Sequence, residues 1–458
     1  MLEGLEVSEV MLSELERTKR FDSEFYKKEN LQIVSFLKER GCDNLVDLVN
    51  ISDGNHMSIS ENFIDSGIPY YRGQDIHSFF IENASPIYIS EDIFNKPLLK
   101  RSHLQKNDIL LSIVGTIGKV AIVSTNDKAT CSCKLAILRP KKRISSELLA
   151  VFLNSRYGQN QIQKYVRGAV QMGLILEDMN QLFVPIFSND FDKNISKSVI
   201  LSKQTLKQSQ ALYRQAEELL LETIGLKDFT PSQEKTNIKT FKESFLATGR
   251  LDAEYYQPKY EEIINVVKNY KNGFANFESF IDSYSTGYPY KSETYIEENG
   301  IPLVRINNLT KEGLDLSNAI QIPKEDLNLS KKDIAKEDDI LISMSGTIGL
   351  SCIVREKNKI IINQRIMKIT SKNYNPQVLS LLLNSIVGKY QLDRIGTGGV
   401  QTNVSSTDIK NILIPIIESE AQQQISALIQ ESFGLRKESE RLLVEAKEMV
   451  EREIGGVK

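Results

Sequence analysis

The cysteines and histidines of this 458-residue chain are too few and too scattered for a metal site or a nucleophilic active site. Cys131 and Cys133 form a C-x-C pair with no second pair and no histidine nearby, so we interpret them as reduced thiols on opposite faces of a strand. The three histidines show no metal-ligand spacing. We therefore expect a cytoplasmic protein without a bound metal or cofactor.

Glycine-rich segments raise the question of nucleotide binding. The segment GTIGK at 115–119 is similar to a phosphate-binding loop, but its spacing is wrong and a later copy has Leu350 in place of the lysine. No G-x-G-x-x-G follows a predicted strand, and the Asn375-Pro376 step lacks the aromatic residue of an amino-methyltransferase motif. The chain is therefore predicted not to be an enzyme by itself. A nuclease or methyltransferase with unrecognised motifs is the least favoured alternative.

Charge is unevenly distributed along the chain. The totals, 57 Lys and Arg against 60 Asp and Glu, leave a net charge of −3. Residues 1–95 carry 8 basic and 18 acidic side chains, whereas residues 96–168 carry 14 and 3, and residues 350–395 carry 8 and 2. Such basic stretches are typical of phosphate contacts with nucleic acid. A solvated basic face, balanced by acidic elements elsewhere, is the alternative.

Basic and amide side chains in and near these stretches are the candidate nucleic-acid contacts, because Arg can bind a guanine edge and Asn or Gln an adenine edge. The candidates are Arg72, Gln74, Lys119, Lys134, Lys141, Lys142, Arg143, Arg167 and Gln171, followed by Arg305, Asn307, Arg365, Gln401 and Asn403. The GTIG turns could offer free backbone N–H groups as well. An ordinary tight hairpin is the favoured interpretation of those turns.

The candidates recur because the chain repeats itself. Six colinear segments return at offsets of 230 to 233: FDSEFY (21–26) as LDAEYY (251–256), GIPYYR (67–72) as GIPLVR (300–305), DILLSIVGTIG (108–118) as DILISMSGTIG (339–349), GAVQ (168–171) as GGVQ (398–401), VPI (184–186) as IPI (414–416), and the Ala216–Gly225 region as the Ala446–Gly455 region. A period this long indicates a duplicated domain rather than a solenoid.

Both copies predict the same elements. An amphipathic N-terminal helix precedes the aromatic-acidic motif, and short β-rich runs follow, among them IPYYR, SPIYI, DILLSIV and VAIVS in the first copy and IPLVRI, DILISM, SCIVR and KIIINQRIMKIT in the second. Single helices are predicted at 146–156 and 376–392. The order of elements shows no βαβ periodicity, so we predict an α+β fold.

A helix of about 30 residues closes each copy. Apolar residues repeat every seven positions, and small residues form a companion stripe in the same register, at 202, 209 and 216 and at 432, 439 and 446. The apolar residues are Val199, Leu206, Tyr213 and Leu220, then Leu428, Leu435, Leu442 and Met449. We expect the two helices to pack closely on each other. Alternatively, each helix caps only its own domain.

The duplicated unit with GIPxxR, DILxSxxGTIG, a glycine-rich loop before V/I-P-I and a terminal long helix resembles the specificity subunit of Type I restriction-modification systems. The D-[SA]-E-[FY]-Y segment is also similar to specificity chains of related Type I-like or Type IIB systems. The resemblance covers essentially the full chain. It implies two tandem target recognition domains with sheet-rich cores, whose long helices form an antiparallel coiled coil.

The resemblance also implies boundaries and partners. Residues 1–192 would form the first recognition domain, 193–226 a spacer helix, 227–240 a linker, 241–417 the second recognition domain and 418–458 the second helix. Each domain would read half of a bipartite, asymmetric sequence in double-stranded DNA. DNA adenine methyltransferase subunits would dock on the helices, and restriction/translocase subunits would complete the complex without a membrane. The alternative is a non-catalytic scaffold whose duplicated domains bind proteins.

Overall fold

The computed structural model describes residues 6–76, 78–81, 86–168, 172–234, 236–317, 319–396 and 403–456. It divides into two units. Unit 1 consists of Met1–Leu206 and Arg436–Lys458, and unit 2 consists of Lys207–Leu435. Each unit has one antiparallel four-stranded sheet with equivalent strands in the same order and a second four-stranded sheet in which three strands are equivalent and one edge strand differs, which confirms the duplication predicted from the sequence.

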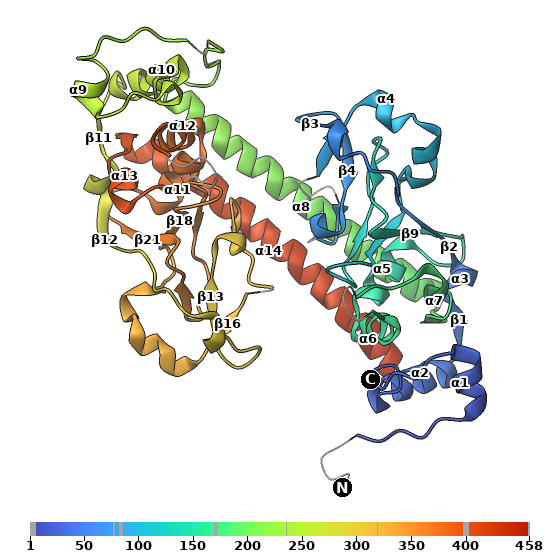
Figure 1. Ribbon diagram of the computed structural model, residues 1–458. Coiled ribbons are helices and arrows are strands. Elements are labelled where there is room, and N and C mark those ends of the chain that lie inside the picture. Colours follow the sequence, from blue (N-terminus) through green and yellow to red (C-terminus); the bar gives the residue numbers. More distant parts are fainter. Residues whose placement is uncertain are drawn as a thin grey trace. The chain divides into compact units, whose positions relative to one another are not determined.

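Unit 1 is built on two four-stranded sheets (Figure 1). The first is antiparallel and has the order β2 (Val49–Asp53), β9 (Leu135–Pro140), β6 (Ile109–Ser112), β7 (Val120–Ile122). The second has the order β3 (Phe63–Ile64), β5 (Ile87–Ile89), β4 (Ile68–Tyr71), β8 (Thr130–Cys131), with β4 and β8 parallel. A small pair, β1 (Cys42–Asn44) and β10 (Phe183–Pro185), joins the beginning of the unit to the segment before its long helix.

Unit 2 repeats this plan. Its sheets have the orders β12 (Ile281–Ser285), β21 (Ile366–Ser371), β18 (Ile340–Ser343), β19 (Ser351–Ile353) and β16 (Gln321–Ile322), β13 (Ile301–Val304), β20 (Ile360–Ile362), β17 (Ile334–Ala335). The small pair is β11 (Phe274–Asn276) and β22 (Leu413–Pro415), and unit 2 adds a hairpin, β14 (Leu309–Thr310) and β15 (Gly313–Leu314). The α+β class predicted from the sequence is confirmed.

Helices cover the sheets and complete the cores. Unit 1 contains α1 (Leu12–Thr18), α2 (Lys28–Arg40), α3 (Leu45–Leu48), α4 (Glu91–Phe94), α5 (Ser146–Asn154), α6 (Arg156–Tyr165) and α7 (Leu176–Met179). Unit 2 contains α9 (Phe245–Thr248), α10 (Pro258–Lys268), α11 (Pro376–Asn384), α12 (Ile386–Ile395) and α13 (Ser406–Lys410). None of the described helices has the length and hydropathy that a membrane span requires.

The helix predicted at 146–156 is confirmed as α5, with α6 following directly after it, whereas the single helix predicted at 376–392 is wrong, because that region forms the two helices α11 and α12. Ser155 has extended backbone angles that end α5, and its Oγ accepts a hydrogen bond from the N–H of Gly158 to begin α6. Ser385 does the same between α11 and α12. A Cβ on Gly158 would lie 2.3 Å from the carbonyl oxygen of Phe152, so this sharp bend requires glycine.

The two long helices, α8 (Asn189–Thr223) and α14 (Ser419–Gly455), pair through the small residues predicted from the sequence. In unit 1, Ser202 Oγ donates to the carbonyl oxygen of Ser439 at 2.9 Å, and Ser439 Oγ donates to the carbonyl of Ser202 at 2.9 Å. In unit 2, seven residues further along α8 and seven back along α14, Ser432 Oγ donates to the carbonyl of Ser209 at 2.7 Å. This register is that of an antiparallel pair, as the resemblance implied.

The apolar residues of the heptad pattern differ in how deeply they are buried. Val199 and Leu220 are fully buried in the cores of units 1 and 2 respectively. The other six are half-buried and flank the serine and alanine stripe: Leu206, Tyr213, Leu428, Leu435, Leu442 and Met449. Small residues therefore occupy the centre of the seam, which allows the two backbones to approach within hydrogen-bonding distance of the serine side chains.

The prediction that Cys131 and Cys133 lie on opposite faces of one strand is wrong, because residues two apart on a strand share a face and because Cys133 is not in a strand. Cys131 ends β8 and is buried, whereas Cys133 lies in the turn between β8 and β9. All four cysteines are free thiols. Burial raises the pKa of Cys131 and Cys352 far above the usual thiol value, so neither supplies a thiolate near neutral pH. The described residues contain no group of three or more His, Cys, Asp or Glu that could hold a metal ion.

Candidate nucleic-acid interface

Three loops of unit 1 meet at the end of strand β6, around Val114. We call this place the loop junction of unit 1. The carbonyl of Lys134, in the turn between β8 and β9, accepts a hydrogen bond from Ile113 N at 3.0 Å. Val114 forms a β-bridge with Gly173, the last residue of the glycine-rich loop. A Cβ placed on Gly73 would lie 3.4 Å from the carbonyl oxygen of Val114 and 3.6 Å from the Lys134 Cβ. The fold thus brings together the Arg72, Lys134 and Arg167 regions, which are far apart in the sequence.

Unit 2 builds the same junction with different side chains. The carbonyl of Arg365 accepts a hydrogen bond from Met344 N at 2.9 Å, as that of Lys134 does in unit 1. Ser345 forms a β-bridge with Asn403, and the Arg365 guanidinium donates to Ser345 Oγ at 3.4 Å. Asn307 and Arg365 are exposed. Of the sequence candidates, unit 2 therefore places Arg365 and Asn403 at this junction.

Two further candidates, Gln171 and Gln401, belong to the glycine-rich loops. Gln171 and Gln401 lie outside the described residues, which resume at Met172 and Asn403. The base of the first loop is held by reciprocal hydrogen bonds between the backbones of Arg167 and Gly173, at 2.9 and 2.8 Å. These loops depart from the same place in each unit.

The GTIG turns are closed hairpins rather than open anion sites. Gly118 N donates to the carbonyl of Ser112 at 2.9 Å, and Ile117 N donates to that of Gly115 at 3.0 Å. Ser112 Oγ donates to the carbonyl of Thr116, and its counterpart Ser343 Oγ donates to that of Thr347. Gly115 and Gly118 have φ of 85° and 93°, which explains why both positions require glycine. The N–H groups of Ile117 and Gly118 are therefore already engaged, which favours the ordinary hairpin.

Arg72 and Arg305 occupy equivalent positions but have different surroundings. In unit 1, Arg72 Nε and Nη2 donate to the two carboxylate oxygens of Asp75 at 3.0 and 2.9 Å, and the Asp75 side chain is only 5% exposed. In unit 2 the equivalent of Asp75 is Asn308, whose Oδ1 accepts from the backbone N–H of Arg305 at 2.9 Å. In the described part of the chain, Arg305 Nε is buried and has no hydrogen-bond partner. Arg72 is thus neutralised locally, whereas Arg305 keeps its charge available.

The remaining basic candidates differ in how far they are engaged. Lys141 Nζ donates to the carbonyl of Val46 at 2.8 Å, and Arg143 forms an ion pair of 3.1 Å with Asp43. Arg167 pairs with Asp178. The exposed candidates are Gln74, Lys134, Lys141, Lys142, Arg143 and Arg167, and Lys119 is half-buried. An exposed ion pair contributes little to stability, so Arg143 can exchange Asp43 for a phosphate at small cost.

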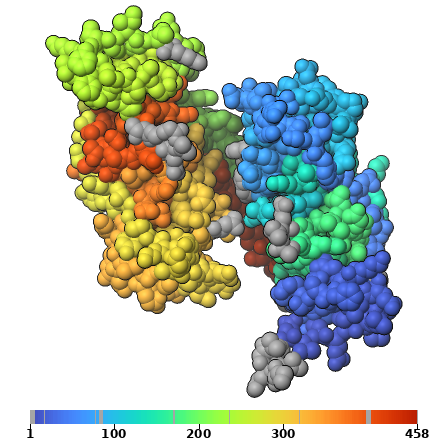
Figure 2. Space-filling view, viewed as in Figure 1, coloured from blue at the N-terminus to red at the C-terminus, as the bar shows by residue number. Residues whose placement is uncertain are grey.

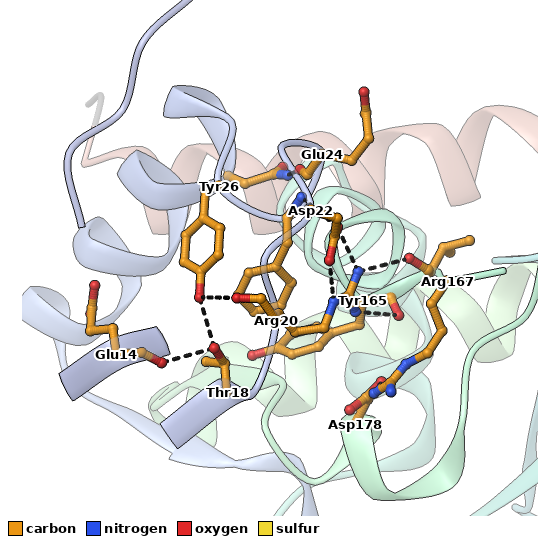
Figure 3. Close-up of polar contacts among 12 residues, drawn as sticks. Glu14, Thr18, Arg20, Asp22, Glu24, Tyr26, Tyr165, Arg167 and Asp178 are labelled. Atoms are coloured by element: carbon orange, nitrogen blue, oxygen red, sulfur yellow. Dashed lines mark hydrogen bonds and ion pairs between the residues drawn. The ribbon is translucent and has the colours of Figure 1, made fainter. Parts of the chain in front are cut away.

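In unit 1, the hydrogen bonds of Thr18, Arg20, Asp22 and Tyr26, which we call the clasp, anchor the base of the glycine-rich loop (Figure 3). Arg20 is 8% exposed, and its guanidinium donates to the carbonyl oxygens of Tyr165 and Val166, at the end of α6. Asp22 accepts from the same guanidinium at 2.6 and 2.8 Å. Thr18 Oγ1 and the Tyr26 hydroxyl share a hydrogen bond of 2.7 Å. The aromatic-acidic motif therefore holds the helix from which the loop departs.

Unit 2 has the same clasp. Arg250 donates to both carboxylate oxygens of Asp252 at 2.7 Å and to the carbonyl of Ile395 at 3.1 Å. Thr248 Oγ1 and the Tyr256 hydroxyl are also hydrogen-bonded. The sequence carries a signal for the clasp, because Thr-x-Arg precedes the D-x-E motif in both copies, at 18–20 and 248–250. The repeat as predicted begins one residue later, at the aromatic or leucine position, and so leaves the threonine and arginine out.

Acid is expected to loosen both clasps. Hydrogen bonds from Arg20 and Arg250 hold the pKa of Asp22 and Asp252 below the ordinary aspartate value. Because these pKa values are lower in the folded protein, the clasps stabilise it above about pH 4, and this stabilisation is lost as the pH falls through the folded-state values. Urea unfolding at several pH values from 6 to 3 should show stability falling with acid, and Asp22→Asn with Asp252→Asn should flatten that fall. An unchanged slope would contradict the assignment.

The family comparison agrees with this architecture. Residues 274–441 match the model described as "Type I restriction modification DNA specificity domain". A stretch of 139 residues is 27% identical to the Type I restriction enzyme EcoBI specificity subunit of Escherichia coli. That stretch is 30% of this chain and only 29% of the relative's length. The match over residues 274–441 and the similarity to the EcoBI subunit confirm the predicted resemblance to specificity subunits of Type I restriction-modification systems.

Two solved structures are similar over most of the chain. The Type-I restriction-modification system S subunit from M. genitalium is 14% identical, with a TM-score of 0.39, over 89% of this chain and 93% of that one. The HsdS subunit from Thermoanaerobacter tengcongensis is 14% identical, with a TM-score of 0.30, over 90% of this chain and 95% of that one.

Proposed function

We propose that this protein is the sequence-specific DNA-binding subunit of a restriction-modification complex. Each unit reads one half of a bipartite target in double-stranded DNA through the loops that meet near Val114 in unit 1 and Ser345 in unit 2. The observation that carries the proposal is that equivalent junctions present basic and amide side chains at the same place in both units, one of them inside the domain matched at 274–441. Phosphate contacts would position each unit and base contacts would specify the sequence.

The two half-sites should differ in sequence. The turn after β4 reads Arg72-Gly73-Gln74-Asp75, whereas the turn after β13 reads Arg305-Ile306-Asn307-Asn308. The turn between the last two sheet strands carries Lys134 in one unit and Arg365 in the other. Side chains that differ at equivalent positions recognise different bases, so the target is asymmetric.

The subunit itself would not be catalytic. Methylation of adenine and cleavage would belong to partner chains, with methyltransferase subunits docked on the helices α8 and α14 and restriction/translocase subunits completing the complex. The proposal is tested by gel mobility of duplex DNA with the chain and its methyltransferase partner over a range of salt concentrations. A steep loss of binding with salt is expected. A salt-insensitive complex, or no shift, would favour a protein-binding scaffold instead.

Replacing Lys141, Lys142 and Arg143 together with alanine should weaken DNA binding without changing the preferred sequence. All three side chains are exposed and none lies at the loop junction, so we assign them to phosphate contacts. The slope of log K against log salt should fall by roughly 2 to 3, about one for each phosphate that is no longer neutralised. Methylome sequencing of the host should show an unaltered target; a new target sequence would contradict the assignment.

A further inference from the structure

An exposed tyrosine of unit 2 lies directly against the turn that carries Arg365. Tyr288 follows strand β12 and forms a parallel β-bridge with Asn363, two residues before Arg365. A Cβ placed on Gly287 would lie 2.2 Å from the carbonyl oxygen of Asn363, so the two segments are in backbone contact. In Figure 2 the yellow, gold and orange segments of unit 2, to which these residues belong, form one continuous surface. Tyr288 therefore borders the loop junction of unit 2.

Tyr288 and the candidate Arg305 lie at the same end of the second sheet. Strands β13 and β20 are parallel, with Val304 beside Ile362. The segments that follow the two strands therefore leave the sheet at one edge, where Asn363 N donates to the carbonyl of Val304 at 2.9 Å. The parallel bridge to Asn363 adds Tyr288 to this edge. The edge thus presents an aromatic ring beside the candidates for DNA contact.

The Tyr288 ring is exposed, yet a buried neighbour supports it. Tyr288 is 38% exposed, and its ring packs edge-on against that of Tyr290, with centroids 5.0 Å apart and 66° between the planes. Tyr290 is only 7% exposed, and its backbone N–H donates to the carbonyl of Tyr288 at 3.0 Å. A ring supported in this way offers apolar contact at a small cost in conformational entropy.

The equivalent residue of unit 1 is Asn55, which forms a parallel β-bridge with Ser132. A Cβ on the preceding Gly54 would lie 2.3 Å from the carbonyl oxygen of Ser132, so the backbone is placed as it is before Tyr288. Asn55 is 3% exposed, and its side chain accepts from the N–H of Met57 and donates to the carbonyl of Met57, both at 2.9 Å. Asn55 thus serves the fold, and the exposed ring distinguishes unit 2.

We infer that the Tyr288 ring contacts the C5-methyl group of a thymine in the half-site that unit 2 reads, which rests on the proposed function and adds a base to it. In the major groove a base pair presents hydrogen-bond donors and acceptors, and thymine adds an apolar methyl group. The exposed Asn307 and Arg365 suit the polar groups, whereas the ring of Tyr288 suits the methyl group. Because Asn55 is buried, the contact should occur in one half-site only.

A double-mutant cycle between protein and DNA tests this contact. Each thymine of the target found by methylome sequencing is replaced in turn by deoxyuridine, which lacks only the methyl group. Fluorescence anisotropy follows binding of each duplex by the full chain with its methyltransferase partner. One replacement should weaken binding by the wild-type chain about fourfold, the effect of roughly one buried methyl group. Tyr288→Ala should weaken the thymine duplex by about fourfold or more and should bind the thymine and uracil duplexes within twofold of each other.

Two variants control for the hydroxyl group and for the loss of a ring elsewhere. Tyr288→Phe keeps the ring, so its affinity should stay within twofold of the wild type and should remain sensitive to deoxyuridine. Phe274→Ala removes a ring of similar exposure, 40%, from β11, which pairs with β22 in a separate two-stranded sheet. This variant should leave both the affinity and the deoxyuridine effect within twofold.

Several results would overturn the thymine contact. It is excluded if no thymine responds to deoxyuridine in the wild-type chain, which is a result that needs no protein variant and so does not depend on how a variant folds. It is also excluded if Tyr288→Ala keeps the deoxyuridine effect, or if Tyr288→Phe weakens binding as much as Tyr288→Ala, which would identify a contact of the hydroxyl group. DNA binding with a steep salt dependence but without this coupling would overturn the thymine contact alone, whereas the absence of such binding would overturn the proposed function as well.

Discussion

Replacing Ser439 with leucine is expected to lower the free energy of unfolding by about 2–4 kcal/mol, which makes it the most destabilising single change we predict. Ser439 is 2% exposed and its Oγ lies 2.8 Å from that of Ser202, so no space is available for a larger side chain. Overpacking a tight core costs roughly 1–3 kcal/mol, and removal of the hydrogen bond to the Ser202 carbonyl adds about 1 kcal/mol. Urea unfolding followed by circular dichroism measures the change.

Two further variants divide this effect into its causes. Ser439→Ala removes the hydroxyl without adding volume, so it should cost only about 1 kcal/mol. Val444→Leu also enlarges a side chain of α14, but at a position that is 50% exposed, and it should change stability by less than about 0.5 kcal/mol. If Ser439→Leu were no more destabilising than Val444→Leu, close packing of the helices at the serine stripe would be disproved.

The seam illustrates what the sequence could predict about the fold. A small residue at every seventh position has few causes other than close approach of two backbones, so the stripe at 202, 209, 432 and 439 predicted the pairing directly. The apolar residues flanking it were less informative, because side chains half-buried at the edge of a seam and side chains in a core have the same heptad spacing. Only packing distinguishes Val199, which is 1% exposed, from Leu206.

Which basic residues are available to contact DNA was harder to predict from the sequence than the pairing of the helices, for a physical reason. Residue type identifies which side chains can contact DNA, but a local partner decides whether their charge is available. Arg72 and Arg305 are indistinguishable as GIPxxR motifs, and the residue that separates them, Asp75 or Asn308, lies outside that motif. The buried Asp108 of the DIL motif is similar: it binds Arg139 and caps a turn by accepting from Gln105 N, which only the fold reveals.

Asn308→Asp is expected to weaken DNA binding about tenfold or more, as much as Arg305→Ala. An aspartate three residues after Arg305 should accept from its guanidinium as Asp75 does from Arg72, and a neutralised arginine no longer attracts a phosphate or a base edge. Removing one well-placed arginine from a DNA interface corresponds to roughly 1–3 kcal/mol. Fluorescence anisotropy with duplex DNA carrying the target, at several salt concentrations, measures the effect.

The reciprocal change in unit 1 provides the control. Asp75→Asn releases Arg72 and should leave DNA affinity unchanged or increase it, although it removes the carboxylate that holds the Arg72 turn. If Arg305 contacts a phosphate, Asn308→Asp should reduce the salt slope by about one, whereas a base contact should relax specificity at one position of the second half-site. If neither Asn308→Asp nor Arg305→Ala changes the affinity or the sequence preference, Arg305 does not contact DNA. Recognition at that junction would then depend on Arg365 and Asn403.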